Sequence, residues 1–221
     1  MYVLRSIVMI IKTEIILASG SRNRRMVLES LGIPFRVVPS NIGEEKIHES
    51  DPIKKVQKIA RLKAQAVATQ HKGLIIAADT FGLFDDREFQ KPASIAIARE
   101  MLQAMSGKTG QFLTGICIIN TERLRETTTF RAVTVRCKKL TYEEIENYIR
   151  KRPVTDWAAA YNPLDKLSSS IFKPLGDHAY RIEYHGLPLD VLAEELKSVG
   201  IKIDLSKFKK GFTKTNFLKQ L

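Results

Sequence analysis

The stretch Ile15-Ile16-Leu17-Ala18-Ser19-Gly20-Ser21-Arg22-Asn23-Arg24-Arg25 decides the fold, because an apolar run changes there into small polar residues and then into a helix pattern. The run 15–18 predicts a short buried strand. Helix-period residues follow as far as Leu31, and Gly32 is typical of a helix end. A strand, a small-residue loop and a helix leave free N–H groups at the helix start, where an anion can bind. Two interpretations stay open here: a turn with a solvated basic face, or a cradle for a triphosphate.

The composition is that of an ordinary globular chain with a strong positive charge. The 221 residues are 44% hydrophobic and 27% charged, and the formal net charge is +12. This length allows one sizeable core, or two small lobes that share a cleft. The charge favours a polyanionic partner such as a nucleotide, a nucleic acid or a membrane surface. No apolar run approaches the roughly 20 residues of a membrane span, so a membrane partner is not expected.

Cysteine usage indicates a reducing compartment. Cys117 and Cys137 are the only two cysteines, and each lies in a β-like apolar stretch. Neither a disulfide framework nor a cysteine metal cluster is therefore expected. We expect a cytoplasmic location.

The chain divides into three parts. Residues 1–13 are expected to form an N-terminal extension. This segment is apolar but short and lacks the small-residue cleavage site of a signal peptide. Met9 is a possible start, because residues 10–18 would then form the first strand. Residues 14–204 are expected to form one folded domain. Residues 205–221 form a lysine-rich tail, which is interpreted as either a solvated end or a binding arm for nucleic acid.

A second predicted helix carries a lysine near its apolar side. Asp51 and Pro52 are a favourable pair for the start of a helix, and apolar residues over 56–67 follow the helical period. Lys63 falls close to the apolar side rather than opposite it. Either its ammonium extends from the core edge into solvent, or it is directed into a cleft.

A carboxylate follows the most strand-like run of the chain. Residues 74–78 are apolar throughout, as in a strand buried on both faces. Asp79 and Thr80 come next and are expected at the strand end, where open α/β sheets place ligands. A hairpin over 81–89 then leads to Lys91.

The remaining pattern alternates helices and strands. The motif Gly107-Lys108-Thr109 is not a phosphate-binding loop, because Leu102 stands where a glycine is required and the strand–helix order is reversed. Thr141 and Glu144 form a capping box. The other predicted elements are helices over 94–105 and 145–151 and a last helix that starts within 186–189 and runs to 198, an antiparallel pair over 111–120 and 127–137, and strands over 33–38, 171–175 and 180–184.

Several segments together resemble the Maf family of nucleoside triphosphate pyrophosphatases over about residues 14–203. Each segment is weak evidence alone, and their order and spacing make the resemblance specific. The segments that carry it are Leu17–Ser21 with Arg24-Arg25 and Leu31-Gly32, Glu44, Lys63-Ala64, Ala78–Thr80, Lys91-Pro92, Ser106-Gly107 with Thr114-Gly115, Glu144-Ile145 and Tyr148, Ala158 with Ala160-Tyr161, and Gly186–Leu189.

The resemblance implies a fold and an activity. The fold would be α/β, with a mixed central sheet, flanking helices and two lobes around a deep cleft, related to the inosine triphosphatase type. The activity would be hydrolysis of a pyrimidine or modified nucleoside triphosphate to monophosphate and pyrophosphate, dependent on Mg²⁺ or Mn²⁺. Family members are often homodimers.

The resemblance also implies roles for particular side chains. Water attack on the α-phosphorus creates a crowded anionic transition state, so positioning and charge neutralisation dominate. The implied catalytic residues are Asp79, Lys63 and Lys91, with Asp79 as general base; the implied substrate-binding residues are Ser19, Ser21, Arg24 and Thr80; the implied metal ligands are Glu44 and Asp79.

Some positions depart from the family pattern. Gly43 replaces the Asp of an Asp-Glu pair, Gly110 replaces a common His, and Ala159 replaces a Gly. A Gln or Glu position falls on Leu164, unless a one-residue shift brings in Asp165. These departures and the basic charge motivate an alternative: a non-catalytic protein that binds nucleotides or nucleic acid.

Overall fold

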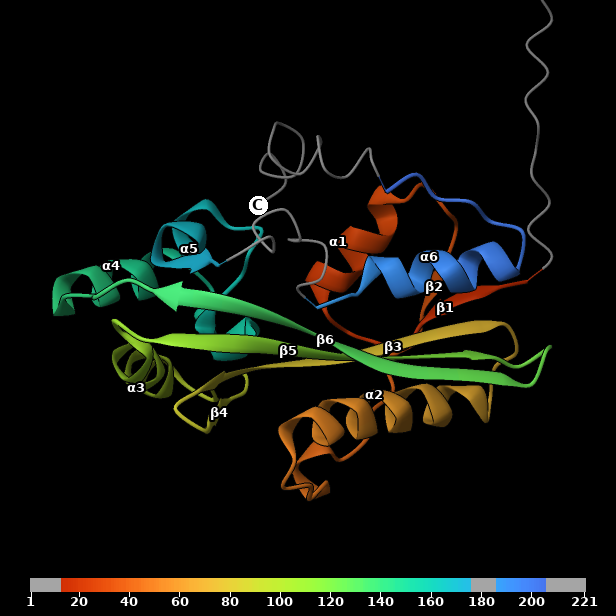
Figure 1. Ribbon diagram of the computed structural model, residues 1–221, viewed down its shortest axis with the longest axis horizontal. Coiled ribbons are helices and arrows are strands. Elements are labelled where there is room, and N and C mark those ends of the chain that lie inside the picture. The colour runs from red at the N-terminus through yellow and green to blue at the C-terminus, as the bar shows by residue number, and fades with distance from the viewer. Residues whose placement is uncertain (1–12, 176–185, 206–221) are drawn as a thin grey trace, which may run out of the picture.

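A seven-stranded mixed sheet forms the centre of the molecule in a computed structural model that describes residues 13–175 and 186–205 (Figure 1). The strand order is β2-β1-β3-β5-β6-β7, and β4 pairs with β3 off this path. The strands are β1 (Ile15–Leu17), β2 (Arg36–Val37), β3 (Leu74–Phe84), β4 (Arg87–Phe89), β5 (Thr109–Asn120), β6 (Arg125–Cys137) and β7 (Phe172–Pro174).

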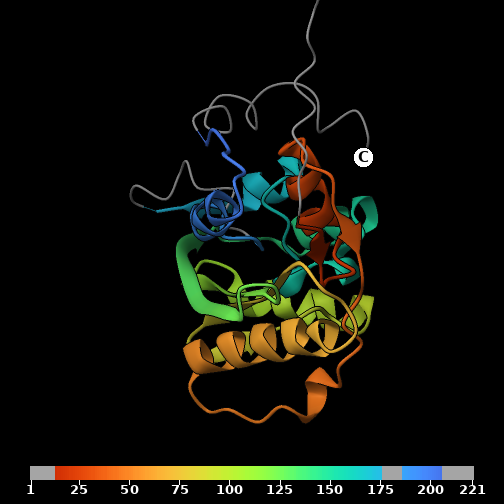
Figure 2. The same cartoon turned by 90° about the vertical axis from the view of Figure 1, so that its right-hand side faces the viewer.

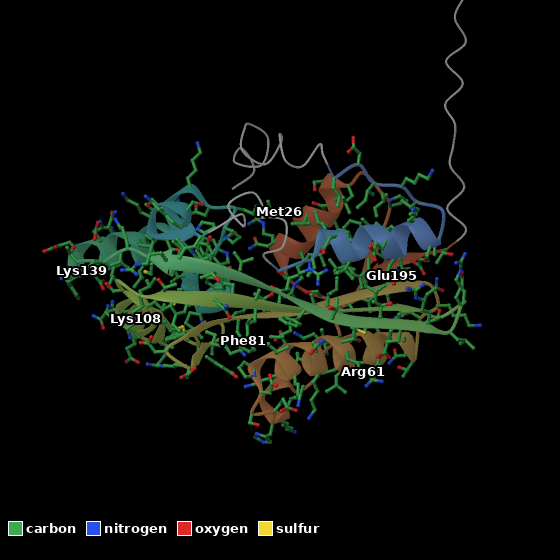
Figure 3. All side chains as sticks on the ribbon, in the orientation of Figure 1. Met26, Arg61, Phe81, Lys108, Lys139 and Glu195 are labelled. Carbon is green, nitrogen blue, oxygen red and sulfur yellow. The ribbon has the colours of Figure 1, made fainter. Side chains whose placement is uncertain are left out.

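Helices cover both faces of this sheet. Helices α1 and α6 lie on one face and α2 lies on the other, while α3, α4 and α5 gather at the far end of the long strands (Figures 1 and 2). The side chains follow this layering: Glu195 of α6 and Arg61 of α2 lie on opposite sides of the sheet (Figure 3). The helices are α1 (Arg22–Ser30), α2 (Pro52–Ala68), α3 (Ile95–Met105), α4 (Tyr142–Lys151), α5 (Lys166–Ile171) and α6 (Leu189–Ser198), with short 3₁₀ turns η1 (Glu44–Lys46), η2 (Val154–Asp156) and η3 (Ala158–Ala160).

The edge of β3 opposite β5 is shared by two different neighbours. β1 runs parallel to its first part, where Leu17 pairs with Ile76, and β4 runs antiparallel to its last part, starting where Phe89 pairs with Gly82. Residues 77–81 lie between these two pairings, and no described strand runs beside them on that edge. The sheet therefore opens in the middle of β3.

The apolar core divides at the same place. One buried cluster joins β1, α1 and α6 to the first half of β3, and a second packs α2 against the other face. A third cluster, built from α3, α4, η3 and β7, fills the end of the sheet beyond the opening. The predicted α/β fold with a mixed sheet, flanking helices and two lobes is confirmed.

Helix α2 packs very closely on the sheet. The short distance between its backbone and the strands fixes how far its side chains, including that of Lys63, lie from the sheet. Asp51 caps its first turn by accepting from the backbone N–H groups of Ile53 and Lys54 at 2.8 and 3.1 Å. At Gly115 of β5, a Cβ atom would lie only 2.2 Å from the carbonyl oxygen of Val56. Glycine at this position lets the helix backbone touch the strand.

The structure corrects several local predictions. Strand β3 continues to Phe84, so Asp79 lies in its middle and not at its end. The strand predicted over 33–38 pairs only over Arg36–Val37, and helix α5 was not predicted. The two aspartates at the tip of the predicted hairpin, Asp85 and Asp86, do form its turn, with φ of 47° and 58°.

Other predictions fall on residues outside the described ranges. These are residues 1–12 of the extension predicted over 1–13, including Met9, together with the strand over 180–184 and most of the basic tail. In the part of the chain that is described, no helix is both long enough and apolar enough to cross a membrane.

Candidate active site

A cavity of about 860 Å³ lies beside the open edge of β3, between the two lobes. Its lining comes from both lobes: the β1–α1 loop, the segment over 39–48, α2 and β3 on one side, and residues 90–91 and 156–161 on the other. All the predicted site residues line it, namely Ser19, Ser21, Arg24, Glu44, Lys63, Asp79, Thr80 and Lys91. Segments that are distant in sequence thus converge on one hollow.

Arg24 is a buried cation whose hydrogen bonds all go to neutral oxygens. Its side chain donates from Nε to the Gly186 carbonyl at 2.6 Å, from Nη1 to Ser19 Oγ at 3.0 Å and from Nη2 to Thr80 Oγ1 at 3.2 Å. A guanidinium has five N–H groups, so one remains on each terminal nitrogen. These two N–H groups remain to donate to phosphate oxygens. Among the described residues, no carboxylate forms an ion pair with Arg24.

Burial shapes the electrostatics of this arginine. Removal from water lowers the pKa of the Arg24 guanidinium, while the negative charges of Asp79 and Glu44 act in the opposite direction. An arginine stays protonated in proteins, so the cavity contains a positive charge with no close counter-ion. Such a site favours an anion.

The two serines of the β1–α1 loop hold the arginine and the loop in place. Ser19 Oγ accepts from Arg24 Nη1 and from the backbone N–H of Ser21 at 3.2 Å. Ser21 caps helix α1 by accepting from the backbone N–H of Arg24 at 3.5 Å. Because both hydroxyl oxygens act as acceptors here, their own hydrogens are left to donate to a ligand.

Thr80 belongs to the arginine side of the cavity. Its hydroxyl accepts from Arg24 and lies 3.1 Å from the hydroxyl of Thr114, its register partner on β5. The predicted substrate-binding residue therefore orients Arg24. Direct contact with a substrate stays a prediction.

Lys63 joins two carboxylates on the opposite face. Its Nζ lies 2.9 Å from Asp79 Oδ1 and 2.9 Å from Glu44 Oε1. Lys63 and Asp79 are buried, with 7% and 5% of their surface exposed, whereas the Glu44 side chain is 46% exposed. Of the two interpretations of Lys63, the ammonium directed into a cleft is the one observed.

The second oxygen of Asp79 is the exception in this network. Asp79 Oδ2 is buried and has no hydrogen-bond partner among the described residues. A buried polar atom without a partner is costly, and here it belongs to a side chain that lines the cavity. It is available to a water molecule or a cation.

Lys91 faces the cavity from the second lobe. It is exposed, and no described acidic residue forms an ion pair with it. The preceding carbonyl of Gln90 accepts from the backbone N–H of Ala159 at 3.0 Å. Ala159 and Ala160 adopt φ of 54° and 53°. Because this bend in η3 bonds to Gln90, it helps to fix the backbone from which the Lys91 side chain extends.

The chemistry of the carboxylates fits a hard divalent cation. Mg²⁺ prefers oxygen ligands, commonly takes one or two carboxylates and completes its shell with water and substrate phosphates. Asp79 and Glu44 supply two carboxylates on one cavity wall, and Asp79 Oδ2 is unpartnered. The described residues contain no cluster of three or more acidic, histidine or cysteine ligands, so a tight all-protein metal cage is absent from them.

The wall of the second lobe includes residues that the sequence did not single out as site residues. Phe112 and Tyr161 line the cavity with ring centroids 4.8 Å apart, and Trp157 lies beside them. Burial raises the pKa of the Tyr161 hydroxyl, so it stays neutral. Inward-facing alternation along β5 is the signal that could have identified Phe112; nothing in the sequence distinguished Asn23, which also lines the cavity.

Leu164 and Asp165, the two candidates for the Gln or Glu position of the family, belong to the segment 162–165, in which Asn162 and Pro163 also depart from the family pattern. Asp165 accepts from Arg152 at 2.6 Å and caps helix α5 through the backbone N–H of Ser168 at 2.8 Å. Neither Leu164 nor Asp165 lines the cavity, whereas Pro163 does. A one-residue shift therefore does not bring Asp165 into the site.

Comparison with known proteins identifies the family. The family model of Maf-like proteins matches residues 14–199. Proteins named dTTP/UTP pyrophosphatase are similar over most of the chain: one from Bacillus cereus is 37% identical and one from Bacillus anthracis is 36% identical, each over 191 residues and 86% of this chain, covering 92% and 97% of those proteins. The chain belongs to the Maf-like protein family.

Solved structures give a weaker likeness. A dITP/XTP pyrophosphatase from Mycobacterium abscessus is 14% identical with a TM-score of 0.39, covering 85% of this chain and 96% of that chain. A score this low carries no conclusion about fold or function.

Proposed function

We propose that this protein hydrolyses the bond between the α- and β-phosphates of a pyrimidine nucleoside triphosphate, giving a monophosphate and pyrophosphate. One observation carries the proposal: a buried arginine without a counter-ion and a buried carboxylate oxygen without a partner line the same cavity. The first suits a polyphosphate, and the second suits the water that attacks it. The names of the Bacillus relatives support the choice of dTTP and UTP.

Asp79 is proposed as the general base. Lys63 holds its Oδ1 at 2.9 Å, which leaves Oδ2 to accept a proton from a water molecule near the α-phosphorus. A positioned base contributes about 10²–10⁴-fold to a rate. The buried position excludes bulk water and strengthens the interaction.

The cations are proposed to neutralise the developing charge. Arg24 would grip phosphate oxygens with its two remaining N–H groups, and Lys91 would add a point charge from the opposite lobe. Ser19 and Ser21 would donate their hydroxyl hydrogens. Lys63 would serve mainly to orient Asp79 and Glu44.

Glu44 and Asp79 are the proposed ligands of Mg²⁺ or Mn²⁺. When bound, such an ion supplies positive charge to the phosphate oxygens. Calorimetric titration with Mn²⁺ tests this assignment, and we expect Glu44→Gln to weaken the binding of Mn²⁺ without loss of the fold.

A substrate screen tests the activity. The purified protein is incubated with each common and modified nucleoside triphosphate and Mg²⁺ or Mn²⁺, and pyrophosphate release is measured. We expect UTP and dTTP to be turned over fastest. Absence of pyrophosphate with every nucleotide, in a folded sample, would refute the proposal.

The Asp79→Asn variant tests the base. We expect kcat to fall by about 10²–10⁴-fold with UTP binding retained, because the amide cannot take the proton. Asp165→Asn is the matched control: it changes a buried aspartate outside the cavity and should lower thermal stability while kcat stays near the wild-type value. Near-normal turnover by Asp79→Asn would exclude Asp79 as the base.

The homodimer and the cytoplasmic location are part of the same proposal, and light scattering of the purified chain tests the dimer. The nucleic-acid-binding alternative gains no support from the relatives, whose names denote nucleotide hydrolysis. That alternative is motivated by the departures from the family pattern and by the net charge of +12, and the basic tail that would serve as its binding arm lies mostly outside the described residues.

A further inference from the structure

We infer that Asn23 presents an amide N–H donor to the phosphates of the nucleotide, and that Asn162 sets its orientation. This inference rests on the proposed function and assigns a role to residues of the 162–165 departure. Asn23 lies in the first turn of α1, one residue before Arg24, and lines the cavity. Asn162 lies in the second lobe, is 1% exposed and does not line the cavity.

A chain of hydrogen bonds fixes both amides. The backbone N–H of Leu164 donates to Asn162 Oδ1 at 3.0 Å, so this end of the Asn162 amide must be the oxygen. Its Nδ2 then donates to Asn23 Oδ1 at 3.4 Å. Because the oxygen of Asn23 is thereby engaged, its Nδ2 is the free end of that amide.

The free end has no competing partner. Among the described residues, no acceptor bonds to Asn23 Nδ2, although the side chain is partly buried. It lies on the same loop–helix junction as Ser19, Ser21 and Arg24, all of which keep donors for an anion. Asn23 thus adds a neutral donor to the arginine side of the cavity without adding to the buried positive charge.

The orientation matters as much as the presence of the amide. A carboxamide rotated by half a turn would present its oxygen, which repels phosphate oxygens. Asn162 is therefore a positioning residue, and its importance depends on its ability to donate rather than on its size.

Binding of inorganic pyrophosphate in the presence of Mg²⁺, measured by calorimetry, tests the inference without turnover. We expect Asn23→Ala to weaken pyrophosphate binding about tenfold, the usual loss for a hydrogen bond to a charged group. In UTP hydrolysis the same variant should raise KM by a similar factor. Unchanged binding by Asn23→Ala would overturn the inference.

The pair Asn162→Ala and Asn162→Asp separates positioning from a purely structural role. Aspartate still accepts from the Leu164 N–H and keeps the local turn, but it cannot donate to Asn23 and would draw Asn23 Nδ2 toward itself. We therefore expect Asn162→Asp to bind pyrophosphate more weakly than Asn162→Ala, although it folds more stably. If Asn162→Asp binds as well as the wild type, the inference is wrong.

A double-mutant cycle removes the effect of the new charge. In the Asn23→Ala background, Asn162→Asp should cause little further loss of binding, because the amide through which it acts is gone. An equal loss in both backgrounds would assign the effect to the charge of the carboxylate and overturn the inference. Failure of the wild type to hydrolyse UTP, with pyrophosphate binding retained, would instead overturn the proposed activity alone.

Discussion

Arg24 and Lys63 are two buried cations that reach one cavity from opposite faces of the sheet, and their surroundings differ in a simple way. Arg24, from α1, donates only to a carbonyl and two hydroxyls. Lys63, from α2, lies between the carboxylates of Asp79 and Glu44. One side of the cavity therefore carries a cation that has no ion-pair partner among the described residues, and on the other side one ammonium lies between two carboxylates. The second side has one more negative than positive charge, and its carboxylates also act on Arg24 through space.

This difference separates two tasks. A buried cation without a counter-ion is costly to the fold, and its charge is stabilised when an anion enters. A lysine that already pairs with carboxylates does not need an entering anion for stabilisation, and it instead holds a carboxylate at a fixed position. We interpret the cavity wall around Arg24 as the part that binds the phosphates. We interpret the wall around Lys63 and Asp79 as the part that takes the proton from water.

Substitution of Arg24 gives the largest expected effect. Arg24→Lys keeps a positive charge but loses the two-pronged donor, so we expect kcat/KM for UTP to fall by about 10²–10³-fold, as for the loss of an oxyanion donor. Arg25→Lys is the matched control, because Arg25 is exposed and pairs with Glu29. Similar kcat/KM values for the two variants would refute the assignment of phosphate binding to the cavity wall around Arg24.

Lys63→Met should affect the fold more than Arg24→Lys does. Removing the ammonium leaves Asp79 buried without its cation, and loss of one partner of a buried pair costs about 3–5 kcal/mol; partial exposure of Glu44 places the expected loss at the lower end. Urea denaturation measures it. Lys138→Met, which breaks an exposed pair with Glu144, should leave the urea midpoint close to the wild-type value, because water and salt screen exposed pairs.

Gly115→Ala tests how strictly the distance between α2 and the sheet is fixed, and with it the position of Lys63 beside Asp79. The added Cβ would meet the Val56 carbonyl at 2.2 Å, and the helix must move away, with an expected loss of about 1–3 kcal/mol. Gly20→Ala meets no atom within 4 Å and serves as the control for stability. Equal urea midpoints for the two variants would show that α2 tolerates displacement.

Much of the site could be predicted from sequence because its residues follow recognisable local patterns. The strand, small-residue loop and helix around Ser19 and Arg24 formed as expected, and the capping signal at Asp51 correctly started the helix that carries Lys63. Each of these depends on neighbours within a few residues. Features that depend only on neighbouring residues, such as helix caps and strand–loop–helix segments, can be predicted from a single sequence.

Most of the features that the sequence did not predict depend on contacts between segments that are distant in the chain. The place of Asp79 within β3 depends on pairing with β5, where Asp79 lies opposite Gly115, and no local pattern around Asp79 reveals this pairing. The positive φ of Ala159 and Ala160 is unexpected for alanine, and it arises where η3 meets the carbonyl of Gln90. Helix α5 is short and contains three serines in its six residues, so its helical propensity is low and its Asp165 cap is decisive.

The two cysteines give the smallest predicted effect and report on the two lobes separately. Cys117 packs under α2, and Cys137 lies in the core of the second lobe. Burial raises the pKa of each thiol to about 11, so the folded state keeps a proton that the unfolded chain loses near pH 9. This contribution to stability is complete below that pH and disappears as the pH rises toward 11.

Between pH 9 and 10 each thiol should therefore lower the free energy of unfolding by about 1 kcal/mol. Urea titrations at both pH values measure the fall, and Cys117→Ala should make it shallower by that amount, whatever its own packing cost. The same variant leaves Cys137 as a single reporter for a thiol reagent. If Cys137 then reacts in the native state at pH 8, the lobe that carries Lys91 opens without global unfolding, and the two walls of the cavity are not equally rigid.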